Sequence, residues 1–373
     1  MGHKYSMKIL VYFSGKLYEA KGTPIRTRNM VAQLLKNSAD VYYAGYDKPK
    51  ELTDSKFLLL TSKLKRIGGL ISFVRKNNID LVYIQTSAGI WYAPFITLFT
   101  KARCGVDFHS RRFQEEKMYK KKGTLWLFFF EQLELFFASF LVFGTAVSHT
   151  LTKYYGRRVK KLLTVPVGVD TILFSPNIAP RKDIMEWKGD STLIAYAGNT
   201  KWYQGIDVLL EQFAKISKEH RGIFKFLVIA SSGIEDVETF MKKEGLSSSV
   251  KVLDKQPHEE IPSLLASADI LTVVRPSDMV TEFSFPSKLP EYAALGKVLI
   301  VSDVSDIGEY IHSGDNGIII KAGDTGALYE ALFQASDKTL QKNLGENARR
   351  LAVSVFDLNE LGKKVYSFLS GIK

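Results

Sequence analysis

The chain has 373 residues, of which 46% are apolar and 24% are charged; this composition is that of a globular protein, and the length exceeds that of one compact core. Its single cysteine, Cys104, excludes a disulfide framework and a cysteine-based metal site. The net charge of +12 is uneven, because residues 1–180 hold 28 Lys and Arg against 12 Asp and Glu (+16), whereas residues 181–373 hold 23 against 27 (−4). We therefore expect an anionic partner for the first half only.

Short apolar strands alternate with helical patterns along the chain, which predicts an α/β protein with parallel sheets covered on both faces. The expected strands are 8–13, 41–45, 80–85, 105–108, 140–142 and 161–165 in the first half, and 192–197, 224–230, 249–253, 270–274, 298–301 and 317–320 in the second. Residues 166–180 are punctuated by proline and glycine and have no period, which predicts a domain boundary. We expect one domain over 1–168, a second over 169–355, and a helix over 356–373 that packs back toward the first.

Two loops of the first half present groups that suit an anion or a sugar. Residues 21–28 predict a loop before a helix over 29–36, in which Gly22 permits close backbone approach and Arg26 favours an anion. His109 follows the strand 105–108, where it can hydrogen-bond a sugar hydroxyl or a departing oxygen, and Arg111 is a further cation. The alternatives are solvated arginines and a histidine with structural bonds.

Positive charge is concentrated at 63–76, a candidate basic amphipathic helix, and at 117–122, just before the apolar run 125–143. The run has the length of a membrane span, but Glu131 and Glu134 near its middle would be costly in lipid. It predicts a buried or membrane-skimming helix followed by a strand. Peripheral contact with an anionic membrane and plain core packing remain alternatives. No RNA-recognition signature, zinc spacing or base-stacking stripe accompanies the basic residues, so no nucleic acid partner is expected.

No cleavable signal pattern precedes the first expected strand. This predicts a cytoplasmic protein, at the inner face of the membrane if the basic half contacts lipid.

The second half places polar groups at two further strand ends. After the strand 192–197, the chain continues through Asn199, Thr200, Lys201 and Gln204 to a helix over 206–217. The stretch 282–303 is the most informative of the sequence. It predicts a loop, a short amphipathic helix opened by Pro-Ser, a glycine stop and a buried strand.

The short helix in this stretch carries the elements of a nucleotide site. Its Pro-Ser start, ending in Ser287, presents backbone N–H groups that suit phosphate, and Lys288 adds a mobile cation. Glu291 shares the helix face with Lys288 and can accept hydrogen bonds from the two hydroxyls of a ribose. Phosphate and ribose together indicate a nucleotide; a capped surface helix is the alternative interpretation.

Over nearly its whole length the chain resembles the retaining GT-B glycosyltransferases of family 4, the glycosyl transferases group 1. The resemblance rests on the glycine loop before Arg26, Asp107-Phe-His109, Val147-Ser148, the string 165–174, the string 203–210, Ala268-Asp269-Ile270 and, above all, 286–297. It implies two Rossmann-like doubly wound domains, the first binding the acceptor and the second binding a nucleotide-sugar donor.

The resemblance also implies roles for individual residues. Glu291 would accept hydrogen bonds from the donor ribose, while backbone N–H groups near Ser287 and the Lys288 side chain would hold the diphosphate. His109 would contact the donor sugar beside the anomeric carbon, and Gly22 would let its loop close over the phosphates.

The sequence departs from the family pattern at three positions. The family's usual pair of acids, eight residues apart, would place the first at Phe283, so Glu282 is one residue out of register. The usual Arg and Lys for the diphosphate fall on Asn199 and Gln204, at a loss of about two charge-assisted hydrogen bonds of ~1.5–3 kcal/mol each. The cations near enough in sequence to compensate are Lys201, Arg275 and Lys288.

The implied reaction is transfer of a hexose-type sugar from a UDP- or GDP-sugar to a lipid-linked or polysaccharide acceptor, with retention of anomeric configuration. No Asp-x-Asp triplet is present for a metal–diphosphate bridge, so no metal and no further cofactor is expected. Two alternatives remain open: a nucleotide-sugar epimerase on the same fold, and a catalytically inactive binding subunit.

Overall fold

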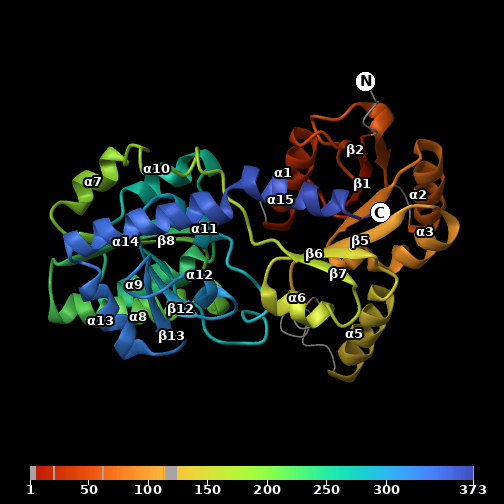
Figure 1. The fold of residues 1–373 in the computed structure, drawn as a ribbon. Helices are drawn as coiled ribbons and strands as arrows, with labels where there is room; N and C mark the ends of the chain where they lie inside the picture. The colour runs from red at the N-terminus through yellow and green to blue at the C-terminus, as the bar shows by residue number, and fades with distance from the viewer. Residues whose placement is uncertain (1–5, 20–21, 61–62, 112, 114–123, 373) are drawn as a thin grey trace. The chain divides into compact units, whose positions relative to one another are not determined.

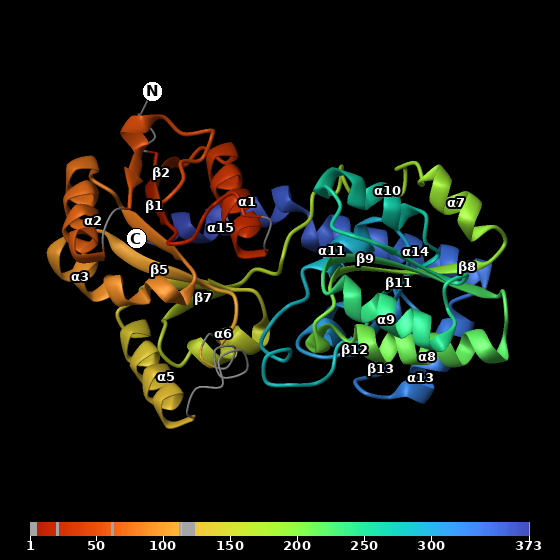
Figure 2. The ribbon, with the colours of Figure 1, turned by 180° about the vertical axis from the view of Figure 1, so that it is seen from behind.

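The computed structural model describes residues 6–19, 22–60, 63–111, 113 and 124–372, which divide into two compact units (Figure 1, Figure 2). Unit 1 comprises Met1–Val167, Phe283–Phe285 and Leu358–Lys373; unit 2 comprises Gly168–Glu282 and Pro286–Asp357. These divisions differ by one or two residues from the domain boundaries expected at 168/169 and 355/356. The predicted basic segment 117–122 lies outside the described residues.

Unit 1 is built on a seven-stranded parallel sheet with the order β3-β2-β1-β4-β5-β6-β7. Its strands are β1 (Lys8–Tyr12), β2 (Asp40–Gly45), β3 (Phe57–Leu59), β4 (Leu81–Gln85), β5 (Arg103–Phe108), β6 (Phe143–Ala146) and β7 (Lys161–Thr164). Its helices are α1 (Gly22–Lys36), α2 (Lys63–Asn77), α3 (Ala93–Phe99), α5 (Thr124–Ala138), α6 (His149–Tyr155) and α15 (Leu358–Ser370). The central strands are apolar and fully buried, because helices cover them on both faces.

The C-terminal helix α15 completes the core of unit 1 (Figure 1). Leu361, Val365 and Leu369 recur at helical spacing and pack with the buried face of α1 against β1, β2 and β4. Lys36 of α1 also donates a 2.5 Å hydrogen bond to Asn359. The last helix of the chain is therefore part of the first folding unit.

Unit 2 is built on a six-stranded parallel sheet with the order β10-β9-β8-β11-β12-β13. Its strands are β8 (Thr192–Asn199), β9 (Phe224–Ser232), β10 (Val250–Leu253), β11 (Ile270–Val273), β12 (Val298–Asp303) and β13 (Ile318–Lys321). Its helices are α7 (Lys182–Lys188), α8 (Ile206–Glu219), α9 (Ile234–Glu244), α10 (Ile261–Ala266), α11 (Lys288–Ala294), α12 (Ile307–Tyr310), α13 (Thr325–Gln334) and α14 (Lys338–Leu351). Its buried apolar side chains pack the sheet against α8, α9 and α13.

Strand order reverses at one point in each sheet, between β1 and β4 in unit 1 and between β8 and β11 in unit 2. In doubly wound sheets, ligands bind at the carboxyl ends of the strands beside such a switch point. In unit 2 the segments that follow β8 and β11 are therefore the expected ligand-binding elements.

The structure corrects the sequence prediction at four elements. The strand expected at 140–142 is wrong: α5 ends at Ala138, a turn follows, and β6 starts at Phe143. The edge strand β3 was not predicted. The helix expected from residue 29 begins at Gly22, since Pro24 has the backbone angle and missing N–H that suit a first helical turn. The helix expected over 356–373 spans only Leu358–Ser370, since Asp357 separates it from the helical turns that follow α14.

In the described part of the chain, no helix combines the length and the apolar character needed to cross a membrane.

One glycine of unit 2 is required by both its backbone angle and its surroundings. Gly205 has φ +71°, and a Cβ there would lie 1.6 Å from the carbonyl oxygen of Val274. Gly222 has a similar φ of +82°, but a Cβ at that position would meet nothing within 4 Å, so it is a matched control.

We expect Gly205→Ala to destabilise the protein by about 3 kcal/mol or more and Gly222→Ala by about 1 kcal/mol. Equal losses in urea unfolding would contradict the close approach of Val274.

Candidate functional site

Lys288 lies at the switch point of unit 2, at the start of α11. Its side chain is 9% exposed, and its ammonium nitrogen Nζ lies 3.9 Å from the centroid of the Tyr196 ring. Nζ donates a 3.0 Å hydrogen bond to Oε1 of Gln204. Among the described residues it forms no ion pair. Lys288 is thus a buried amine held by a ring face and an amide oxygen rather than by a carboxylate.

Two glycines shape the space around this amine. Gly198 has φ +146°, and a Cβ there would lie 2.8 Å from Lys288 Nζ, so a larger residue would displace the ammonium group. Gly205, which precedes α8, approaches Val274 closely enough to bring the two loops after β8 and β11 together. Tyr196 was not among the predicted site residues, because its contact with Lys288 joins β8 to the distant α11.

Arg275 is the second cation of this cluster. It follows β11, is 5% exposed, and its backbone N–H donates a 2.7 Å hydrogen bond to Ser302. Its Nε donates a longer, 3.4 Å bond to the carbonyl oxygen of Tyr203. Burial first, and the positive charge of Arg275 second, lower the pKa of Lys288 well below its ordinary value. The two cations are therefore near enough to repel each other.

Glu291 lies one turn along α11 from Lys288 and supplies the nearby negative charge. Its carboxylate makes no hydrogen bond to the described residues. Burial raises the pKa of this carboxyl to about 7, and the charge of Lys288 only partly opposes that shift. A carboxylate with open acceptor positions beside two cations can receive the hydroxyls of a sugar while the cations hold an anion.

The remaining residues that were predicted to bind the donor lie on the same loops and differ in the hydrogen bonds that they make. Asn199 accepts a 3.2 Å hydrogen bond from the backbone N–H of Lys201, and the Thr200 hydroxyl is within reach of two carbonyl oxygens of the turn after β9. Ser287 is exposed and makes no capping bond, and α11 has only seven residues. A helix this short has a weak dipole, so its N-terminus would attract an anion less than predicted. The side chains of Lys288 and Arg275 are the stronger source of positive charge at this position.

Both carboxylate oxygens of Glu282 accept hydrogen bonds within unit 2. One oxygen accepts a 2.6 Å bond from the Ser277 hydroxyl and the other a 2.9 Å bond from the backbone N–H of Ser305. Ser305 has φ +58°, an uncommon angle for a residue with a side chain. Glu282 therefore ties two loops of unit 2 together, and its predicted contact with the donor sugar stays a prediction.

In unit 1, Arg26 and Asp107 form a fully buried ion pair. The guanidinium Nε and Nη2 donate to the two oxygens of Asp107 at 2.7 and 3.0 Å, while Nη1 and Nη2 also reach the carbonyl oxygens of Pro166 and Val165 at 3.0 Å. Burial opposes ionisation of Asp107, but Arg26 and then His109 outweigh it, and the pKa of the carboxyl is lowered. Arg26 of α1 thereby joins β5 to residues 165–166, which follow β7.

His109 is bound on both ring nitrogens. Nε2 lies 2.8 Å from Asp107, and since a carboxylate can only accept, Nε2 carries the hydrogen. Nδ1 lies 3.2 Å from the Thr23 hydroxyl in the first turn of α1, next to Gly22. A Cβ on Gly22 would meet nothing within 4 Å, so packing in the described structure does not demand a glycine there. A ring-nitrogen contact to a sugar would have to displace Thr23.

Arg111 is also paired. Its Nε and Nη2 donate to one oxygen of Glu131 at 2.9 and 2.6 Å, and the guanidinium lies between the rings of Tyr154 and Phe283 at 4.5 and 4.7 Å from their centroids. Each of these arginines is paired with a carboxylate within unit 1, so an anion would have to compete with Asp107 for Arg26 and with Glu131 for Arg111; their contact with an anion stays a prediction. Glu115 and Glu116, which also follow His109, lie outside the described residues.

Comparison with curated proteins supports a family for the second half of the chain. Residues 178–351 match the family model described as Glycosyl transferases group 1. N-acetyl-alpha-D-glucosaminyl L-malate synthase of Bacillus anthracis is 26% identical over 217 residues, which cover 57% of this chain and 55% of that protein. The chain spans about half the length of the curated relatives that it matches.

Comparison with solved structures covers nearly the whole chain. A glycosyltransferase from Rickettsia africae ESF-5 has a TM-score of 0.77 at 18% identity, covering 98% of this chain and 100% of that one. Anabaena HepE in complex with UDP has a TM-score of 0.77 at 14% identity, covering 98% and 99%. With the two parallel sheets, these neighbours confirm the predicted GT-B fold.

The raised pKa of Glu291 predicts a pH-dependent stability. In the unfolded chain this carboxyl ionises near pH 4.5, whereas in the folded protein it ionises near pH 7. Its contribution to the free energy of unfolding is therefore fully present below pH 4.5 and is lost as the pH rises through 7. Relative to Glu291→Gln, we expect the wild-type unfolding free energy to fall by about 2 kcal/mol between pH 5 and pH 8. Parallel pH profiles of the two proteins in chemical denaturation would show that folding does not raise the pKa of Glu291.

Proposed function

We propose that this chain, whose residues 178–351 match the group 1 glycosyltransferase family, is a retaining, metal-independent glycosyltransferase. It would transfer a hexose-type sugar from a UDP- or GDP-sugar to a lipid-linked or polysaccharide acceptor. Unit 2 would bind the donor and unit 1 the acceptor. The curated relatives and the GT-B neighbours support glycosyl transfer in general, and the residues of unit 2 support the donor class.

The buried cluster of Lys288, Arg275 and Glu291 is the observation that carries this proposal. Two cations near enough to repel each other, with one of them held by no carboxylate, raise the free energy of the unliganded site. A dianionic diphosphate would relieve that repulsion. Glu291, with open acceptor positions, would then receive the ribose hydroxyls.

Arg275 compensates in this proposal for the cations that the family usually has at Asn199 and Gln204. The Gln204 amide oxygen binds Lys288 Nζ at 3.0 Å, so it orients the remaining amine rather than the phosphate. Arg275 reaches the same cluster from the loop after β11. This arrangement favours an active enzyme over an inactive binding subunit.

The same groups suit the chemistry of the transfer. As the bond between the anomeric carbon and the diphosphate oxygen breaks, its electron pair stays on that oxygen, and Lys288 and Arg275 would stabilise the growing charge. The acceptor hydroxyl oxygen bonds to the anomeric carbon from the same face, and its proton passes to the departing phosphate oxygen. Configuration is then retained without a covalent enzyme intermediate.

The donor base and the membrane contact are also part of the proposal. Anabaena HepE has been solved with UDP and with UDP-glucose, which supports a uridine nucleotide ahead of a guanosine one. The +16 balance of residues 1–180 supports peripheral contact of unit 1 with an anionic membrane that carries a lipid-linked acceptor.

A thermal-shift screen against UDP, GDP, ADP, TDP and CMP with a chelator present tests the donor site. We expect one nucleoside diphosphate to raise the melting temperature, because a ligand of the folded state stabilises it by mass action. Lys288→Ala should weaken that binding at least ~10-fold, equivalent to ~1.4 kcal/mol, whereas Lys342→Ala on the exposed side of α14 should not. A flat response to all five nucleotides would refute the donor site.

The role of Arg275 predicts a difference between diphosphate and nucleoside binding. Arg275→Met should weaken binding of the diphosphate by about 10-fold or more while leaving the weak binding of the free nucleoside unchanged, because one charge-assisted interaction is lost. Arg275→Lys should recover part of the affinity, and circular dichroism would verify that both variants are folded. Equal losses for both ligands would assign Arg275 a purely structural role.

Product analysis separates the proposal from an epimerase. Incubation with donor and no acceptor should leave the nucleotide sugar unchanged; its conversion to an epimer would overturn glycosyl transfer as the activity.

A further inference from the structure

Exposed apolar side chains are concentrated in one region of unit 1. Of the nineteen large apolar side chains that are exposed among the described residues, ten lie on α3, on α5 or directly after α5. These ten are Phe95, Leu98, Phe99, Leu125, Trp126, Phe128, Phe129, Phe130, Phe136 and Phe140. We call them the aromatic surface. Single exposed apolar residues are ordinary, but a contiguous set of this size marks an interaction site.

The two carboxylates of α5 are buried against the protein, whereas most of its aromatic side chains are exposed. Glu131 and Glu134 face inward, where Glu131 binds Arg111 and the Tyr154 hydroxyl, and Glu134 accepts a 2.6 Å bond from the Tyr155 hydroxyl. The two carboxylates that argued against lipid contact are therefore sequestered. On the outer side, Leu125 is 85% exposed and Trp126 is 68% exposed.

A ring contact links α5 to the segment that leads into α3. The rings of Trp126 and Phe129 meet edge to face at one end of α5, and Phe136, Phe137 and Phe140 form a cluster at the other. Phe137 packs on Trp91, with ring centroids 4.8 Å apart, and Phe95 and Phe99 follow Trp91 at four-residue intervals along α3. Both views of the fold show α3 and α5 at the same end of unit 1 (Figure 1, Figure 2).

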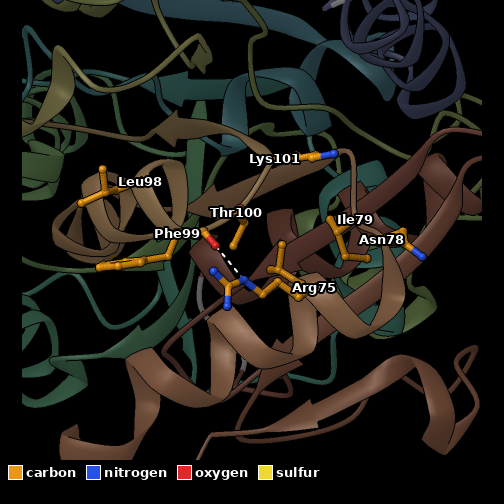
Figure 3. Close-up of a pocket in the computed structure, with 8 residues that line it drawn as sticks. Arg75, Asn78, Ile79, Leu98, Phe99, Thr100 and Lys101 are labelled. Atoms are coloured by element: carbon orange, nitrogen blue, oxygen red, sulfur yellow. Dashed lines mark hydrogen bonds between the residues drawn. The ribbon is translucent and has the colours of Figure 1, made fainter.

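Cations border this surface on the side of α3. A pocket of about 420 Å³ lies between the ends of α2 and α3, with Leu98 and Phe99 in its wall (Figure 3). Arg75 and Lys101 also line it and are exposed; Arg75 Nε donates a 2.8 Å bond to the Phe99 carbonyl oxygen (Figure 3). Lys76 is a further exposed cation at the end of α2.

The sequence adds positive charge just before α5. Lys117, Lys120, Lys121 and Lys122 precede the first residue of that helix by only a few positions in the chain. Apolar side chains with tryptophan among them, combined with cations beside α3 and in the sequence before α5, match the layered chemistry of an anionic bilayer surface.

We propose that the aromatic surface is a peripheral docking site for an anionic lipid bilayer, with Trp126 and the phenylalanines entering the headgroup region and Lys76, Arg75 and Lys101 meeting lipid phosphates. A second copy of the chain is disfavoured as the occupant, because it would bring the same positive charge to the contact. The inference rests on the membrane contact of the proposed function and names its surface. It is tested without a sugar donor, so its failure is distinct from a failure of glycosyl transfer.

Sedimentation of the full chain with vesicles tests the proposal. We expect binding to vesicles that contain phosphatidylglycerol, weaker binding to phosphatidylcholine alone, and loss of binding at high salt. Trp126→Ser with Phe129→Ser should weaken binding about tenfold or more. The matched control, Met185→Ser with Val353→Ser, replaces two exposed apolar side chains in unit 2 and should bind as the wild type does.

Charge reversal and fluorescence give independent readouts. Lys76→Glu with Lys101→Glu should weaken binding by about fivefold or more for each charge, whereas Lys218→Glu with Lys342→Glu in unit 2 should have little effect. Anionic vesicles should shift the tryptophan emission to the blue, and Trp126→Phe should abolish that shift while retaining binding.

Three results would overturn the proposal. They are absence of sedimentation with either vesicle, equal salt-insensitive binding to both, and a dimer in vesicle-free solution that the Trp126→Ser, Phe129→Ser variant dissociates. The last would assign the surface to a second copy of the chain.

Discussion

The switch point of unit 2 depends on burying the amino group of Lys288 without a carboxylate bound to it. The face of Tyr196 and the amide of Gln204 hold this group, and the absence of a side chain at Gly198 leaves room for it. Arg275 adds positive charge to the same place. A site so arranged is more stable with an anion present, which is why we interpret it as a binding site and not as a structural ion pair.

In unit 1, the buried carboxylate Asp107 is bound by oppositely charged and polar side chains. Asp107 is neutralised by Arg26, receives a 2.6 Å bond from Thr145 and binds His109, so each charge is compensated within the unit. A network satisfied in this manner is rigid. It holds the histidine ring in one orientation at the carboxyl end of β5. The two sites therefore differ, since Asp107 is bound by Arg26 and His109, whereas Lys288 is bound by an aromatic ring and an amide.

The apolar helix α5 connects the packing of unit 1 to its outer surface. Its inner carboxylates bind Arg111 and two tyrosines, and this anchoring leaves its aromatic side chains outside. Mean composition could not distinguish this arrangement from a buried helix or a membrane span, because all three need a run of apolar residues. The pairing of Glu131 and Glu134 across the tertiary structure decides among them.

The sequence by itself determined the two parallel α/β units and the candidate Lys288 and Glu291, since strand periodicity, glycine stops and helix starts are local properties. It misplaced β6 and the start of α1, where an apolar run and a proline have more than one local solution. Only the tertiary structure decided which charges are compensated. Arg26 in α1 and Arg275 after β11 are both buried arginines, but Arg26 pairs with Asp107, whereas Arg275 lies near Lys288. That difference arises from contacts between segments distant in sequence, which no local pattern encodes.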